Sequence, residues 1–215
     1  MSTPETQYHQ MLLTMLSMQN AMNQKVHSQW QTENYAWHRA IWVECAELLD
    51  HYGWKWWKKQ TPDAEQVALE LVDIFHFGLS CFLNQGLSDT EIAQHIEEAF
   101  QQAEATDNTA DFREVIEAIA ATALTEKRFD FQNFYTAMRF CEMSVESLFQ
   151  QYVGKNTLNF FRQDNGYKTG EYQKTWNGQE DNEHLAEILQ ALDASDVEYP
   201  KQVYQALESR YPQNQ

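Results

Sequence analysis

Apolar residues along the chain recur every three or four positions rather than every second one, which is the periodicity of amphipathic helices. Helix breakers are scarce, because there is no proline between Pro62 and Pro200 and no glycine between Gly86 and Gly154. The pattern predicts helices over about 8–30, 35–51, 64–85, 88–100, 110–126, 130–153, 181–193 and 201–210. We see no strand-rich segment, low-complexity tract or internal repeat. The sequence therefore predicts one all-α domain, a multi-helix bundle, over residues 1–215.

Local signals support some of these boundaries. Asp63 or Thr61 is expected to cap the third helix and Gly86 to end it, while Ser88 with Glu91 fits a capping box. The sixth helix, predicted over 130–153, could also continue beyond Gly154. Four of the seven glycines lie within 154–178, a segment that is either an ordered functional loop or a disordered one, and its aromatic residues favour order.

Charge and composition exclude several classes of protein. A net charge of −17 disfavours nucleic-acid binding, which needs a basic surface. We find no apolar run of about 20 residues, as a membrane span would need, and the N-terminus has no features of a secretory signal. The three cysteines are odd in number and far apart, which is typical of a reduced, cytoplasmic protein.

Two pairs of acids are the most informative chemical feature. Glu44 and Glu47 are three residues apart in one predicted helix, and Glu70 and Asp73 are three apart in the next. Residues at i and i+3 share a helix face, so two packed helices would bring four carboxylates together. Such a group needs a cation, and oxygen ligands favour Mg²⁺ or Mn²⁺ over zinc. The alternative is a solvated acidic stripe, which the surrounding apolar residues disfavour.

Three further features suggest a nucleotide ligand, and each has a structural alternative. The loop GWKWWKK joins the two acidic helices, with Lys55, Trp57 and Lys58 suited to phosphate and base, although such a loop is also able to plug a core. A second basic cluster follows residue 154, although its lysines fit a solvated loop equally well. Gln19 and Asn23 lie four residues apart on the first helix, where they fit a pyrimidine edge or a helix–helix hydrogen bond equally well.

These motifs together resemble those of the dimeric all-α dUTPases, a family within the all-α nucleoside triphosphate pyrophosphohydrolases that also includes a phage dCTPase-dUTPase. The resemblance is carried by MQNAMN, by E-x-x-E at Glu44 and Glu47, by WKWWKK, by ELVDIFHF at 70–77 and by the segment from Lys155 to Asn182. The acidic motifs are shared across the superfamily, whereas the WKWWK loop and FRQDNGY…EDN are more specific. Residues 88–130 carry none of the motifs.

The resemblance implies Mg²⁺-dependent hydrolysis of dUTP to dUMP and pyrophosphate, with the metal site between two helix pairs. Glu44, Glu47, Glu70 and Asp73 would bind metal, and Glu44 or Glu47 would take a proton from the attacking water. Gln19, Asn23 and Trp57 would frame the uracil, and His76 and Phe77 would lie near the deoxyribose. The phosphates would be held by Lys155, Asn159, Arg162, Tyr167, Lys168, Lys174 and Asn182. A homodimer is expected, whose site draws residues from both subunits.

Other functions remain open from the sequence. The same site would suit dUDP, dCTP or a broader set of deoxynucleoside triphosphates, since an amide turns to suit uracil or cytosine. A protein of a different class would bind nucleotide or a protein partner on this scaffold without turnover. The least specific alternative is an acidic helical bundle with a structural metal. No nucleic-acid or membrane partner is expected.

Overall fold

The structure, a computed structural model, describes residues 4–106, 109–194, 196 and 198–212. Within them the α-helices are α1 (Pro4–Val26), α2 (Trp37–Tyr52), α3 (Ala64–Leu83), α4 (Asp89–Glu104), α5 (Phe112–Glu126), α6 (Phe131–Phe140), α7 (Val145–Asp164), α8 (Asp181–Ala191) and α9 (Tyr199–Arg210). Two 3-10 turns, η1 (Trp30–Thr32) and η2 (Tyr167–Thr169), and two short strands, β1 (Thr175–Trp176) and β2 (Gln179–Glu180), complete the order. The predicted all-α class is confirmed.

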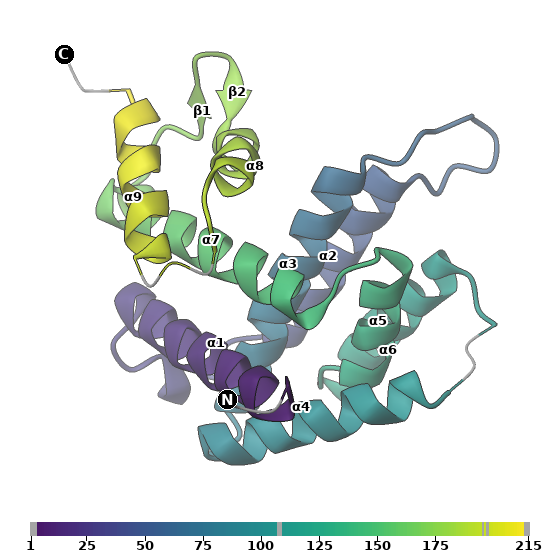
Figure 1. Cartoon of the computed structure of the whole chain (residues 1–215). Coiled ribbons are helices and arrows are strands. Elements are labelled where there is room, and N and C mark those ends of the chain that lie inside the picture. Colours follow the sequence, from purple (N-terminus) through teal and green to yellow (C-terminus); the bar gives the residue numbers. More distant parts are fainter. Residues whose placement is uncertain (1–3, 107–108, 195, 197, 213–215) are drawn as a thin grey trace.

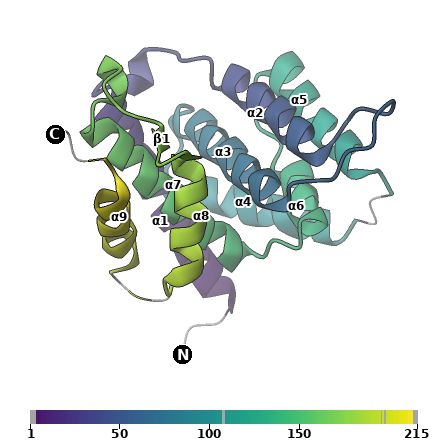
Figure 2. The same cartoon turned by 90° about the horizontal axis from the view of Figure 1, so that it is seen from above.

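Helix α3 lies at the centre of the molecule. It packs along α2 and also contacts α1, α4, α6 and α7. In the view from above, α1, α7, α8 and α9 lie on one side of α3, and α2 and α5 lie on the other (Figure 2). By length and composition α3 would be able to cross a membrane, but 78% of that window is buried inside the fold. Its apolar surface is thus already covered by neighbouring helices.

The capping signals explain where several helices begin. The Asp63 side chain accepts a hydrogen bond from the Gln66 N–H and caps α3, and Ser88 with Glu91 forms the predicted capping box of α4. Helix α3 ends at Leu83, before the predicted end at Gly86.

The helix predicted over 130–153 is wrong, because the chain turns between α6 and α7. Glu142 has a φ of +51°, in the left-handed region, and the Ser144 side chain caps the new helix by accepting from the Ser147 N–H. Helix α7 then continues to Asp164, so the first part of the glycine-containing segment at 154–178 is helical.

A small hairpin was also missed. Thr175 pairs with Glu180 and Trp176 with Gln179, and the turn between them is Asn177-Gly178. Both turn residues have positive φ, +51° and +88°, which suits a two-residue hairpin turn of the Asn-Gly kind. The hairpin adds no layer to the bundle, and it anchors the start of α8 (Figure 1).

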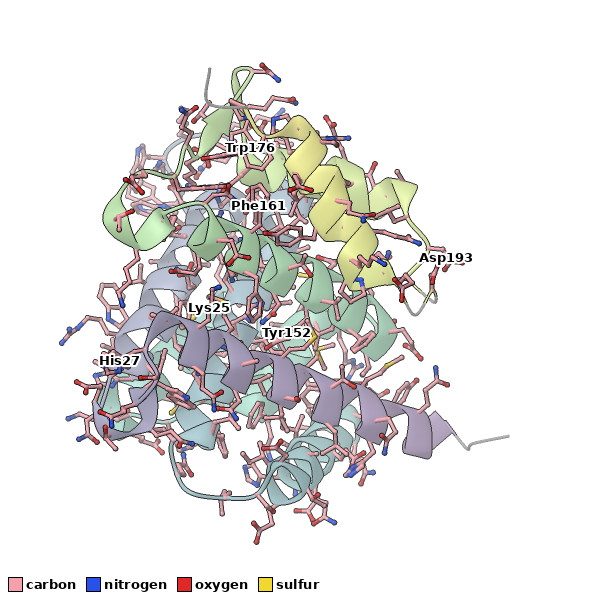
Figure 3. All side chains as sticks on the ribbon, turned by 90° about the vertical axis from the view of Figure 1, so that its left-hand side faces the viewer. Lys25, His27, Tyr152, Phe161, Trp176 and Asp193 are labelled. Atoms are coloured by element: carbon pink, nitrogen blue, oxygen red, sulfur yellow. The ribbon has the colours of Figure 1, made fainter. Side chains whose placement is uncertain are left out.

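Two hydrophobic clusters form the core. The larger one contains residues from α1 to α7, and the smaller one lies among α7, α8, α9 and the hairpin. Helix α7 contributes to both, with Tyr152 in the first and Phe161 in the second. Figure 3 shows Tyr152 where α7 crosses α1, and Phe161 near Trp176 in the upper cluster. One domain over residues 1–215 stays a prediction, and α7 is the element that joins the two clusters.

Candidate active site

Three of the four predicted metal ligands come together between α2 and α3. One carboxylate oxygen from each of Glu44, Glu47 and Glu70 lies within 4.8 Å of the other two. Glu47 is exposed, Glu44 is partly buried and Glu70 is buried. The i,i+3 spacing places each pair on one face, and the close packing of α2 on α3 turns the two faces toward each other.

The electrostatics of this cluster require a proton or a cation. Burial, followed by the charges of Asp73, Glu70 and Glu47, raises the pKa of Glu44 to about 9. Burial and Asp73 also raise the pKa of Glu70. Several carboxylates so close together resist ionisation unless positive charge is added. Their oxygen-only donor set fits a hard divalent cation such as Mg²⁺ or Mn²⁺.

Asp73, the fourth predicted ligand, pairs with an ammonium group. Its Oδ2 lies 2.7 Å from the Nζ of Lys155, whose side chain is only 3% exposed. Lys155 Nζ also donates to Asn182 Oδ1 at 3.0 Å. This lysine therefore joins α7 to the carboxylates of α3 and to the start of α8.

Other predicted phosphate-binding residues gather beside Lys155. Arg162 donates to the side-chain oxygens of Asn159 at 3.2 Å and of Asn182 at 3.3 Å. The Arg162 guanidinium lies over the Tyr167 ring, 5.9 Å from its centroid. Lys168 and Lys174 lie farther out, since Lys168 donates to the Val26 carbonyl and Lys174 pairs with Glu180, and both side chains are exposed.

A cavity of about 230 Å³ opens next to Asp73. Its walls include the predicted residues Gln19, Asn23, His76, Phe77 and Asn159. They also include residues that sequence reasoning missed: Met22, Val26, Trp30, Tyr35 and Trp37. The aromatic residues near the junction of the first two helices were the available signal. In the structure the ring of Trp37 stacks on Phe77 with centroids 6.4 Å apart.

Hydrogen bonds fix the amide of Gln19 within this wall. Gln19 Oε1 accepts from Tyr152 Oη and faces His76 Nδ1, both at 2.7 Å, while Gln19 Nε2 donates to Asn23 Oδ1 and Ser80 Oγ. Asn23 Nδ2 also donates to Ser80 Oγ. Gln19 thus links α1 to α3 and α7 by hydrogen bonds. This arrangement corresponds to the helix–helix hydrogen bond, one of the two alternatives that the spacing of Gln19 and Asn23 left open.

His76 brings an unpaired acceptor to the same wall. Burial lowers its pKa to about 4, so the imidazole is neutral near pH 7. Because an amide oxygen only accepts, the proton belongs on Nδ1, and Nε2 is then an acceptor. Nε2 is buried and has no hydrogen-bond partner among the residues that the structure describes. A buried acceptor of this kind calls for a donor from a ligand or from water.

The tryptophan loop between α2 and α3 lies apart from this cavity. Trp57 is 57% exposed and packs edge-on against Trp54 and Trp56. Lys55 and Lys58 line a separate hollow with Arg113. The loop extends beyond the ends of α2 and α3 (Figure 1). Within the part of the chain that the structure describes, Trp57, Lys55 and Lys58 are not among the residues that line the cavity beside Asp73.

Comparison with known proteins identifies the family. Residues 11–167 match a family model described as dUTPase. No curated protein shows a significant match. The matched segment holds the carboxylate cluster, the cavity wall and Arg162, and it ends before α8. The match covers more than half of the chain, which therefore belongs to the all-α dUTPase family, whose activity is that of a dUTP diphosphatase.

Proposed function

We propose that this chain hydrolyses dUTP to dUMP and pyrophosphate, using Mg²⁺, or Mn²⁺ as a substitute, bound by Glu44, Glu47, Glu70 and Asp73. The supporting observation is the convergence of three carboxylates within 4.8 Å in a chain of the dUTPase family. The raised pKa of Glu44 supports it further, because a cation relieves the repulsion that holds a proton there.

When bound, the divalent cation would neutralise the triphosphate and lower the pKa of a coordinated water. Glu47 is the better-placed proton acceptor, since its carboxylate is exposed while Glu44 is partly buried. Glu47 would take the proton as water attacks the β-phosphorus. Glu44 would serve mainly as a ligand, and its proton would be released to solvent when the cation binds.

The cationic residues beside the cluster would hold the triphosphate. Lys155 is poised to exchange Asp73 for a phosphate oxygen. Arg162 would supply further donors as charge moves onto the α-phosphate of the leaving dUMP. Asn159 and Asn182 already contact Arg162 and would orient it. Tyr167, Lys168 and Lys174 would close over the phosphates from the segment after α7.

The cavity beside Asp73 would hold the deoxyuridine. Its walls are largely apolar and aromatic, and its volume of about 230 Å³ suits a nucleoside rather than a larger ligand. His76 Nε2 would accept a hydrogen bond from a donor of the nucleoside, and Phe77 would pack against the deoxyribose. dCTP and dUDP remain alternative substrates of this cavity.

We also propose a homodimer in the cytoplasm. The α2–α3 loop exposes Trp54, Trp56 and Trp57, and a second subunit would cover them. Trp57 would then reach a nucleotide across the subunit boundary, which accounts for its distance from the cavity of its own chain.

Product analysis of Glu47→Gln tests the catalytic assignment. Wild-type protein with Mg²⁺ should convert dUTP into equal amounts of dUMP and pyrophosphate. Glu47→Gln should lose about 10²- to 10⁴-fold in turnover, as loss of a general base does, with an unchanged circular dichroism spectrum. Glu65→Gln is the matched control, because Glu65 is an exposed acid in the first turn of α3 outside the cluster.

Three outcomes would contradict this proposal. Orthophosphate as the primary product would indicate cleavage at the γ-phosphorus. Equal turnover of Glu47→Gln and wild type would remove Glu47 from the mechanism. Nucleotide binding without any turnover would favour the non-catalytic alternative.

A further inference from the structure

Asp181 is a buried acid that neither the acidic motifs nor the family match includes. It is the first residue of α8, and its side chain is fully buried. Its backbone N–H donates to the Lys174 carbonyl at 2.9 Å, at the base of the hairpin. A buried carboxylate is costly unless it is paired, so its partners indicate its role.

The Asp181 carboxylate engages three donors. Arg162 donates to it through Nε at 2.7 Å and Nη2 at 2.8 Å, and Tyr172 Oη donates at 2.8 Å. Two parallel bonds fix the plane of a guanidinium as well as its position. Burial alone would lower the pKa of Arg162, but the carboxylate outweighs it and raises that pKa. Burial would raise the pKa of Asp181, and Arg162 holds it below its usual value instead.

Hydrogen bonds connect Arg162 to the rest of the site. Its Nη1 donates to Asn159, which lines the nucleotide cavity, and its Nη2 contacts Asn182. The same Asn182 oxygen accepts from Lys155, which pairs with Asp73. A continuous chain of hydrogen bonds therefore joins Asp181 to the carboxylates of α3.

Aromatic packing supports Asp181 and Tyr172 from behind. The ring of Tyr172 stacks on Tyr211 with centroids 5.4 Å apart and planes 7° apart. Tyr211 Oη accepts the Gln173 N–H at 3.1 Å, and the neighbouring Trp176 is fully buried. Figure 3 shows Trp176 close to Phe161 of α7, where the hairpin meets that helix. The C-terminal part of the chain thus forms a rigid support for one guanidinium.

We propose that Asp181 is a positioning residue for the triphosphate: by holding the Nε–Nη2 edge of Arg162, it presents the guanidinium to the phosphates in a fixed orientation. This inference rests on the proposed function. An orientation fixed before binding removes an entropic cost that a free arginine side chain would pay when substrate binds. The support comes from residues beyond 167, in the hairpin segment, α8 and Tyr211 after α9.

The test is a double-mutant cycle with Asp181→Asn and Arg162→Met. Affinity for a nonhydrolysable dUTP analogue and for deoxyuridine is measured by calorimetry with Mg²⁺ present. Asp181→Asn should weaken the triphosphate about 10- to 100-fold and leave deoxyuridine affinity within about twofold. In the Arg162→Met background the same change should have almost no further effect on the analogue, because the two residues act as one unit.

Additive effects in the cycle, or equal losses for the nucleoside and the triphosphate, would overturn the proposal and leave Asp181 a purely structural residue. If Asp181→Asn fails to fold, Tyr172→Phe provides the same test, because it removes only the hydrogen bond from Tyr172 Oη to Asp181. It should give a smaller loss that is again confined to the triphosphate. Turnover of dUTP by wild type is measured in parallel: its absence would refute the proposed function, while coupling in the cycle would still support the positioning role.

Discussion

At the scale of single residues, Glu44 links the chemistry of the site to the stability of the fold. Its pKa of about 9 in the folded protein exceeds the ordinary value of 4.5, so the native state keeps a proton that the unfolded chain releases. Stability rises with pH only where the unfolded state binds more protons, and here it binds fewer. Without metal, stability should therefore fall as pH rises from about 5 to 9.

Urea unfolding in the presence of a chelator checks this sign. Wild type should lose up to about 1.4 kcal/mol per pH unit, less the screening of a partly exposed group. Glu44→Gln should give a flatter curve, and saturating Mg²⁺ should flatten the wild-type curve because the cation replaces the proton. Parallel curves for wild type and Glu44→Gln in chelator would contradict the assignment.

The sequence predicted the acids well because their spacing is a local property. Residues i and i+3 share a helix face whatever the rest of the fold does, so each pair could be predicted to lie on one face. Convergence of Glu44 and Glu47 with Glu70 also needed the two helices to pack together, which the single short loop between them favoured. The pairing of Asp73 with Lys155 could not be predicted, because it depends on how α7 crosses α3. Asp181 was missed for the same reason, since its partner Arg162 belongs to another helix.

At the scale of elements, Gly78 lets α3 approach the chain before α6. A Cβ added there would lie 2.5 Å from Cε1 and 2.8 Å from Cγ of Phe129, a ring that is 1% exposed. Gly78→Ala should therefore destabilise the protein by about 1–3 kcal/mol, although alanine in a helix interior normally gains about 1 kcal/mol over glycine.

Gly154→Ala on α7 is the matched comparison. Its added Cβ would meet Cδ2 of Leu189 at 2.5 Å and Cδ1 at 2.8 Å, which are the ends of a flexible side chain. Chemical denaturation of both variants should show the larger loss for Gly78→Ala. A stabilised Gly78→Ala protein would mean that Phe129 moves aside without cost.

Element boundaries were predictable where capping chemistry marks them, as at Asp63 and Ser88. The turn between α6 and α7 has no glycine or proline. The periodicity of apolar residues therefore predicted one continuous helix over 130–153. Ser144 was the one available signal, since serine favours the N-cap. The hairpin had a clearer signal in Asn177-Gly178, but its strands are too short to show alternation.

At the scale of the whole molecule, the exposed tryptophan loop predicts self-association. Trp56 is 90% exposed, and such a side chain is costly to leave in water. Sedimentation at micromolar concentration should give twice the 25.3 kDa of one chain. Trp56→Ser with Trp57→Ser should weaken the dimer. A wild-type monomer at that concentration would contradict both the dimer and the shared site.

The central claim is that a carboxylate-bound metal site in this fold hydrolyses dUTP. The most direct measurement is the rate of pyrophosphate release from dUTP, dCTP, dTTP and UTP, each with Mg²⁺ and with excess chelator. We expect rapid release from dUTP that requires Mg²⁺, with slower release from the other three nucleotides. Undiminished release from dUTP in excess chelator, or no release from any of the four with Mg²⁺, would contradict it.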